Sequence, residues 1–235
     1  MKYISALLVL MISSFLVYGQ KSRIDLADYN SIDVFGAVEV ELIKADKPYV
    51  EIEYNGISKE DFVADVNSGV LRLKIKNRHY LDDWSSDHNY NRSDYVKVKA
   101  YYVELEVIDG QAGAIISSRA PIKSKNLYVD CSMGAEIDLE LIGQRAKLKS
   151  SMGGILTLSG RIEYIDVRAN MGGELKAAHL KSRVANVSAS MGAEVRINVD
   201  EEIEATSSLG AVVQYIGSPS VRNVNRNLGG EVNNR

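Results

Sequence analysis

The chain has 235 residues with 28 Lys and Arg against 31 Asp and Glu, a formal net charge of −3. This balance gives no electrostatic reason to bind nucleic acid or an anionic membrane, and we expect neither as a partner. The single cysteine, Cys131, excludes an intramolecular disulfide, and we expect its thiol to be buried. Only three prolines and many β-branched residues favour an all-β chain.

Residues 1–19 have the pattern of a secretory signal peptide. Lys2 gives a positive start, residues 4–17 are apolar except for small serines, and cleavage is expected before Gln20. No later segment is long and apolar enough to span a membrane, and a lipoprotein signal would need a cysteine at the cleavage point. We therefore expect an exported, non-lipidated protein in the periplasm, on the outer surface or outside the cell, with residues 20–235 forming a single domain.

Residues 25–107 contain several irregular strand patterns. Apolar residues alternate around residues 32–42, 50–54, 70–75 and 96–107, but these runs do not share the register of the downstream repeat. The segment Phe35-Gly36-Ala37-Val38 is similar to a degenerate first copy of that repeat. We expect these strands to start the fold or to cap it.

A polar loop at residues 80–95 is the first candidate ligand site. Its aromatic side chains could stack on sugar rings, and its carboxylates could bind a cation. The acidic spacing matches no EF-hand loop, so a solvated insertion whose aromatic residues pack back on the domain is the alternative. The candidate residues are Tyr80, Asp82, Asp83, Trp84, Asp87 and Tyr90.

A repeat runs through residues 108–235. The segment Ser132-Met133-Gly134-Ala135-Glu136 recurs five times, and residues 111–115 form a weaker early copy. We expect each repeat glycine to occupy a turn that requires positive φ and leaves no room for a Cβ. These turn glycines are Gly134, Gly153, Gly172, Gly192, Gly210 and Gly229, separated by 19, 19, 20, 18 and 19 residues.

Alternation on both sides of each glycine predicts two strands per repeat. Stacking the repeats buries one apolar column per strand, which predicts a parallel β-helix (β-solenoid) of about 19 residues per rung. The leucine-rich repeat pattern is absent. One inward column is Val129, Leu148, Val167, Val187, Ala205 and Val224, the other is Ile137, Leu156, Leu175, Val195, Val213 and Val232, and Asp130, Lys149, Arg168 and Ser188 should face solvent.

Three further columns carry expectations. The Met and Leu side chains beside the turn glycines should fill a corner of the core, with soft-metal binding through their thioethers as the alternative. The small column that includes Cys131 should lie inside the tube. Arg222 and Arg226 fall in otherwise apolar or small columns of the last repeat, and we interpret them as part of a C-terminal cap.

The export signal, the opening Ile32-Asp33-Val34-Phe35-Gly36-Ala37-Val38-Glu39-Val40 and the repeated small-x-Gly-small turns resemble the auto-transporter adhesin "head GIN" domain family. The similarity spans residues 24–232, with Ser-Met-Gly here where that family commonly has Gly-Ser-Gly. The resemblance implies a β-helical envelope or surface protein, and it provides no catalytic residues to transfer.

A second candidate site lies in the column that follows the turns. Glu174 and Glu194 should stack on adjacent rungs, as weak candidates for a calcium site or a glycosidase carboxylate pair. A solvated edge flanked by Lys176 and Arg196 is the alternative. No Ser-His-Asp, Cys-His or zinc pattern is present, so we expect no catalytic residues, no cofactor and no metal.

These observations favour an exported, non-catalytic binding module of the envelope or surface. Its partner is expected to be a polysaccharide or an envelope or host protein. A polysaccharide lyase or hydrolase built on a β-helix is the first alternative, and the nearly constant rung length argues against its loop-walled cleft. A self-assembling structural protein, and with it a homo-oligomer, is the second.

Overall fold

The computed structural model of the protein describes residues 21–76 and 95–235, and it confirms a β-solenoid. All strands belong to one wrapped sheet, and the helical content of this described part is the short 3₁₀ turn η1 (Lys59–Asp61). The strands are β1 (Lys21–Asp25), β2 (Ser31–Phe35), β3 (Val38–Lys44), β4 (Tyr49–Asn55), β5 (Phe62–Asn67), β6 (Val70–Ile75), β7 (Tyr95–Tyr102), β8 (Val107–Gln111), β9 (Ile115–Ser118), β10 (Ile122–Ser132), β11 (Glu136–Ser151), β12 (Ile155–Asn170), β13 (Glu174–Ala189), β14 (Glu194–Ser208), β15 (Val212–Ile216), β16 (Val221–Asn227) and β17 (Glu231–Asn234).

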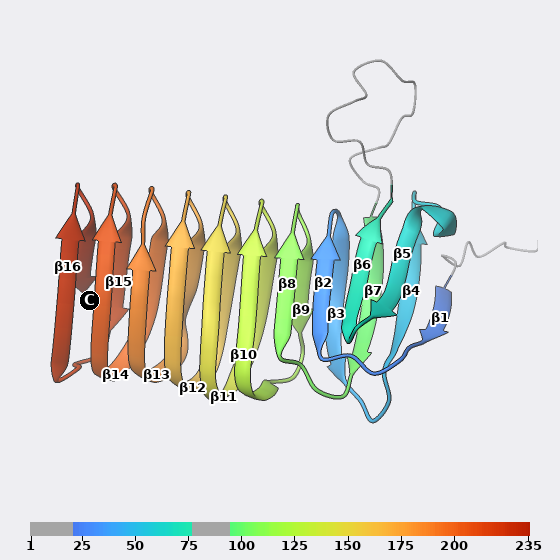
Figure 1. The fold of residues 1–235 in the computed structure, drawn as a ribbon, viewed down its shortest axis with the longest axis horizontal. Coiled ribbons are helices and arrows are strands. Elements are labelled where there is room, and N and C mark those ends of the chain that lie inside the picture. Colours follow the sequence, from blue (N-terminus) through green and yellow to red (C-terminus); the bar gives the residue numbers. More distant parts are fainter. Residues whose placement is uncertain (1–20, 77–94) are drawn as a thin grey trace, which may run out of the picture.

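The regular rungs run from β8 to β17 and stack in parallel (Figure 1). Both predicted inward columns are confirmed, because Val129 pairs with Leu148 and Ile137 with Leu156, and the same register continues along the stack. Within these columns all residues are buried except Val224, which is partly buried in the last rung. The small column is buried as predicted, and burial raises the pKa of the Cys131 thiol to about 12.

Each regular rung turns through two residues with positive φ, the geometry of a type I′ turn. In the Met133-Gly134 turn, φ is 53° and 72°, and the Ala135 N–H donates to the Ser132 carbonyl at 3.1 Å. The expected absence of room for a Cβ is wrong for Gly134 and its equivalents, since a Cβ there would meet open space. The crowded position is the next residue, where a Cβ on Gly173 would lie 2.4 Å from the Ser150 carbonyl oxygen.

The methionines beside these glycines do not fill the core. Met133, Met152, Met171 and Met191 are 39 to 51% exposed, and Leu209 and Leu228 continue the row. Alternation places side chains inward only while the backbone is extended, and the left-handed turn turns these side chains out to solvent. An L-residue in this conformation costs about 1–2 kcal/mol relative to its favoured conformation.

The N-terminal rungs stack in an order different from their order in the chain. β2 and β3 form one rung, which lies between the β8–β9 rung and the β6–β7 rung. The chain therefore passes outward before it returns to build the regular stack. The expected degenerate copy at Phe35-Gly36-Ala37-Val38 is the turn of the β2–β3 rung, with a φ of 94° at Gly36.

Antiparallel strands cover the outer side of the β6–β7 rung. β4 pairs with β7, β5 pairs with β6, and β1 pairs with β4 (Figure 1). The predicted capping role of this region is confirmed. At the other end, Arg222 and Arg226 take inward columns but are exposed, and Arg226 donates to the Val232 carbonyl at 2.6 Å.

Candidate binding face

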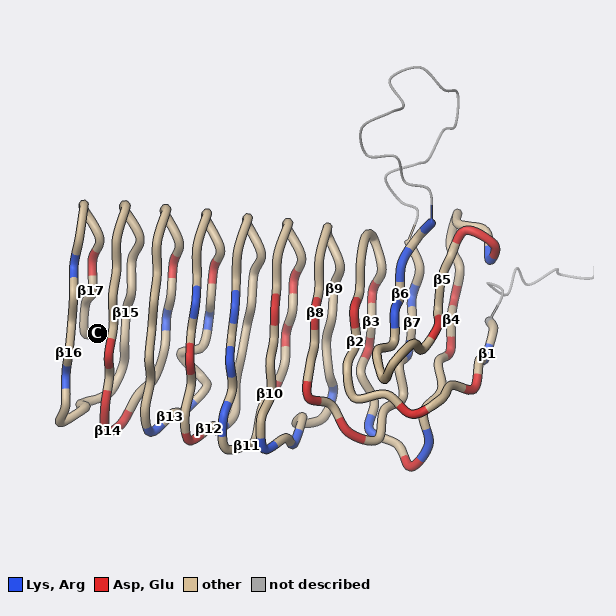
Figure 2. Tube along the Cα trace, viewed as in Figure 1, with Lys and Arg blue, Asp and Glu red and all other residues tan. Residues whose placement is uncertain are grey.

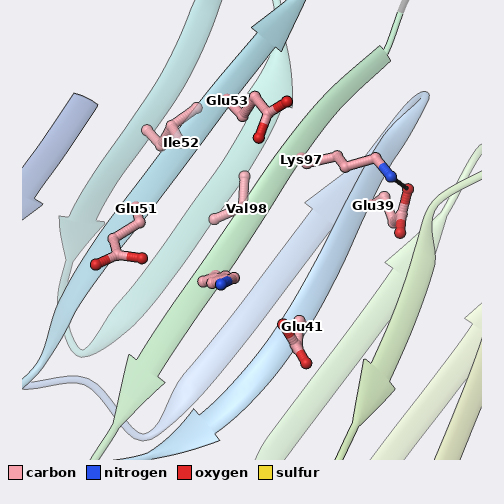
Figure 3. Close-up of a pocket in the computed structure, with 8 residues that line it drawn as sticks. Glu39, Glu41, Glu51, Ile52, Glu53, Lys97 and Val98 are labelled. Atoms are coloured by element: carbon pink, nitrogen blue, oxygen red, sulfur yellow. Dashed lines mark ion pairs between the residues drawn. The ribbon is translucent and has the colours of Figure 1, made fainter. Parts of the chain in front are cut away.

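A shallow groove of about 150 Å³ lies on the outer face of β4, β7 and β3 (Figure 3). β7 is the middle strand, parallel to β3 and antiparallel to β4. Because alternate residues of a strand point to the same face, the outward residues of the three strands form two rows across the sheet. One row is Glu53, Lys97 and Glu39, and the other is Glu51, Lys99 and Glu41.

Each lysine in the groove therefore lies between two glutamates. Lys97 Nζ is 3.1 Å from Glu39 Oε2, and this hydrogen bond raises the pKa of Lys97. Arg119 pairs with Glu41 at the edge of the groove. Four carboxylates against two ammonium groups leave the groove itself with an excess of negative charge, and Figure 2 marks the charged residues along these strands.

An aromatic stack borders the groove on the same face. The rings of Tyr49 and Tyr101 lie 3.9 Å apart and nearly parallel, and the Arg23 guanidinium covers the Tyr49 ring at 3.8 Å. The Tyr101 hydroxyl donates to Glu51 Oε2 at 3.4 Å, which ties the stack to the groove. Loss of hydration, with the neighbouring Tyr49 and Glu51, raises the pKa of Tyr101 to about 12, so the phenol is neutral at physiological pH.

The same face continues along the regular rungs through β9, β11, β12, β13 and β14. Glu174 and Glu194 are paired on adjacent strands of it, as the sequence indicates. Arg196 bridges them, with nitrogens 3.7 Å from Glu174 and 3.2 Å from Glu194, and Lys176 lies 3.2 Å from Glu174. The arrangement is that of the solvated ion-paired edge, the alternative given above for this pair.

The opposite face carries a column of aspartates on adjacent rungs. Asp33 pairs with Asp109, and Asp109 with Asp130. The expectation that Asp130 faces solvent is wrong: it points outward but is 8% exposed, since the Tyr128 hydroxyl and Lys149 Nζ both bond its Oδ2, at 3.0 and 2.7 Å. Burial, and secondarily the neighbouring carboxylates, raise the pKa of Asp109.

The candidate residues of the polar loop lie outside the described residues. Tyr80, Asp82, Asp83, Trp84, Asp87 and Tyr90 fall within residues 77–94, and their role stays a prediction. The described ends of this segment are informative. β6 and β7 form one rung, so residues 77–94 replace the two-residue turn that joins the strands of a regular rung.

Residues 28–219 match the family model "Putative auto-transporter adhesin, head GIN domain". The chain belongs to this family. Among solved structures, a putative adhesin from Bacteroides fragilis superposes with a TM-score of 0.80 at 17% identity, covering 92% of this chain and 96% of that one. A putative adhesin and a putative lipid binding protein, both from Parabacteroides distasonis, superpose with TM-scores of 0.72 and 0.65 at 15% and 16% identity, each over 92% of this chain and 96% of the other.

No curated protein matches the head GIN chain in sequence. The solved structures support the solenoid fold, and the family supports an adhesin-like surface protein. Within residues 21–76 and 95–235, no helix is long and apolar enough to cross a bilayer. The same ranges contain no group of three His, Cys, Asp or Glu residues placed to hold a metal ion.

Sequence reasoning missed the Glu–Lys groove and the tyrosine stack. Alternation alone identifies the separate runs Glu39/Glu41, Glu51/Glu53 and Lys97/Lys99 as outward faces of strands. Their assembly depends on β4 folding back against β7, which no local pattern indicates. The signal that could have found the site is the matched period of opposite charges on strands that are far apart in the chain.

Proposed function

We propose that this head GIN protein is an exported adhesin-like module that binds a neutral polysaccharide on the outer face of β4, β7 and β3. The tyrosine stack beside the groove is the observation that carries the proposal. Aromatic faces suit the apolar faces of sugar rings, and the carboxylates and ammonium groups beside them can bond ring hydroxyls. Because Arg23 and Tyr101 cover the two faces of the Tyr49 ring, the ring offered to a sugar is that of Tyr101, and the stack holds it rigidly, which lowers the entropic cost of binding.

The shape of this face favours an extended polymer over a small molecule. The groove is shallow, whereas pockets for small ligands enclose most of their ligand. From β4 to β13 the face crosses seven adjacent strands, on the order of 30 Å at normal strand spacing. The surplus of carboxylates in the groove would repel uronate or sulfated polymers, so the proposed ligand is uncharged.

The rung connections support binding rather than cleavage. Enzymes built on β-helices need walls of long loops around clustered acids, whereas the rungs from β8 to β17 turn through two residues on one edge. The stacked pair Glu174 and Glu194 is neutralised by Arg196 instead of facing an open cleft. Export through the signal-peptide pattern of residues 1–19 and a location in the envelope or outside the cell complete the proposal.

A glycan array that includes neutral and acidic polysaccharides tests this function, with purified mature protein. Tyr101→Ala should weaken binding to a neutral polymer roughly tenfold, the equivalent of about 1.4 kcal/mol. Tyr164→Ala is the matched control, because Tyr164 is also a surface tyrosine under an arginine but lies on the second half of β12, whose rows lead to β10 and not to β9 and the groove. Trp84→Ala tests the polar loop separately.

Each outcome selects one site or one class of partner. Loss with Tyr101→Ala and not with Tyr164→Ala supports the groove. Loss with Trp84→Ala alone overturns the groove and returns the site to residues 80–95. If the folded protein binds no glycan on the array, the proposal of a polysaccharide ligand is overturned, and a protein partner or self-assembly is left.

A further inference from the structure

The methionines of this chain are concentrated in one structural position. The sequence has six, of which Met1 and Met11 lie in the expected signal peptide. The other four, Met133, Met152, Met171 and Met191, occupy the same turn position in four consecutive rungs. The buried core of the described residues contains no methionine and is built from Ile, Leu, Val, Ala and aromatic residues.

Neither turn geometry nor burial explains this choice. The first position of a type I′ turn favours Asn or Gly, and these methionines have φ between 47° and 53°. They are 39 to 51% exposed, so they add little to the core. The chain therefore holds four thioethers at its surface in a backbone conformation that disfavours their side chains.

The turns form a continuous ladder along one edge of the solenoid (Figure 1). The Gly134 N–H donates to the Met152 carbonyl at 3.2 Å, and the Gly172 N–H donates to the Met191 carbonyl at 3.0 Å. Adjacent methionines are thus separated by the spacing of paired strands, about 4.8 Å. Two sulfurs on opposite sides of one soft cation would be about 4.6 Å apart if each bond has the length of a zinc–sulfur bond, about 2.3 Å.

We propose that this ladder binds soft monovalent cations, Cu(I) or its analogue Ag(I), through pairs of thioethers from adjacent rungs. Thioether sulfur selects soft metals over Ca²⁺ or Mg²⁺, which take oxygen ligands. The three rotatable bonds of each methionine let its sulfur adjust to the cation. Glu136 follows the first of the four turns and adds negative charge beside the ladder, whereas Glu194, after the last of them, is paired with Arg196.

Titration of chloride-free Ag(I) into mature protein tests the proposal, followed by native mass spectrometry and by the ¹³C methyl signals of methionine. Every variant carries Cys131→Ser, because the Cys131 thiol would compete for silver. Serine fits this position, since the column of Cys131 already contains Ser150 and Ser207. Four thioethers taken in pairs should bind two ions, and all four methyl signals should shift.

The chain supplies its own matched control. Leu209 and Leu228 continue the ladder with φ of 52° and 46°, so leucine is compatible with the turn. Replacing all four methionines by leucine should abolish the two Ag(I) sites without changing the circular dichroism spectrum. Adding Leu209→Met and Leu228→Met to the Cys131→Ser protein should raise the stoichiometry to three.

Two results would overturn the metal site. One is equal Ag(I) binding by the folded four-leucine variant, which would place the ion elsewhere. The other is unchanged methyl signals together with self-association that the four-leucine variant keeps and a four-asparagine variant loses. That second result would identify the ladder as an apolar contact between copies of the chain.

Discussion

The regular rungs and the N-terminal region are both built from β-strands, but they pair these strands differently. From β8 onward the rungs stack in parallel in the order of the chain, and turns of constant geometry join the two strands of each rung. In the N-terminal region β4, β5 and β1 run antiparallel, and the β2–β3 rung lies inside the β6–β7 rung although it comes earlier in the chain. Repetition builds the length of the molecule, and departure from repetition builds the candidate binding face.

The difference arises because the two regions close their edges differently. A growing parallel stack exposes unpaired backbone groups at each end. The last rung limits this with exposed arginines at inward columns, while the N-terminal end adds antiparallel strands. Those added strands bring Glu51 and Glu53 against the lysines of β7, so the cap and the candidate groove are the same structure.

Breaking the inward column of the regular rungs should have the largest effect. Val187 is 1% exposed at the centre of the stack, and Val187→Asp buries an unpaired carboxylate there. We expect a loss of more than about 4 kcal/mol and an unfolded protein, measured by urea denaturation. Ser188→Asp on the outward side is the control, and equal stability of the two variants would contradict the register.

Alanine substitutions at Gly172 and Gly173 should show which of these two turn residues tolerates a Cβ less well. Gly172 has a φ of 70° but open space around its Cβ position, so Gly172→Ala should cost about 1–2 kcal/mol for the left-handed backbone. Gly173→Ala should cost more, because its Cβ would meet the Ser150 carbonyl at 2.4 Å and force the backbone apart. Denaturation midpoints of the two variants measure the difference.

A greater loss of stability with Gly172→Ala than with Gly173→Ala would show that the left-handed backbone is the greater constraint. Four other rungs have alanine at the position of Gly173, namely Ala114, Ala135, Ala193 and Ala211. The Ser150 hydroxyl donates to the Gly154 carbonyl at 2.7 Å and helps to fix the backbone below Gly173. Adding Ser150→Ala should therefore restore part of the stability that Gly173→Ala loses.

The same contrast explains what the sequence could predict. Each predicted inward column has an apolar residue at the same place in six successive repeats. Such agreement does not arise by chance, so the sequence alone determines that Leu148 and Val187 point inward. The methionines were misplaced because alternation holds only through extended backbone, and it ends at the two left-handed residues of the turn. The groove was missed because the pairing of β4 with β7 has no repeated copy to reveal it, although the outward position of Glu51 and Lys99 is readable in each strand alone.

The aspartate column should give the smallest effect and the clearest pH dependence. Asp109 lies between Asp33 and Asp130, and its pKa is raised by burial and by these carboxylates. Like charges on paired strands destabilise a sheet by roughly 0.2–1 kcal/mol, so Asp109→Asn should raise the unfolding free energy at pH 7 by about that amount. Its retained side-chain oxygen can still accept from Gln111 Nε2, which lies 3.0 Å from Asp109 Oδ1.

The sign with pH follows from the raised pKa. An unfolded Asp109 loses its proton near its ordinary pKa of 3.8, while the folded carboxyl keeps the proton to higher pH. Stability of the native protein therefore falls as pH rises through that window, and the ionised form carries the penalty at neutral pH. The stability advantage of Asp109→Asn should vanish below about pH 4, where the wild-type carboxyl is protonated in both the folded and the unfolded state. Unfolding curves at pH 3.5 and pH 7 compare the two proteins, and an advantage that persists unchanged at pH 3.5 would show that packing, rather than the stacked charges of this column, separates them.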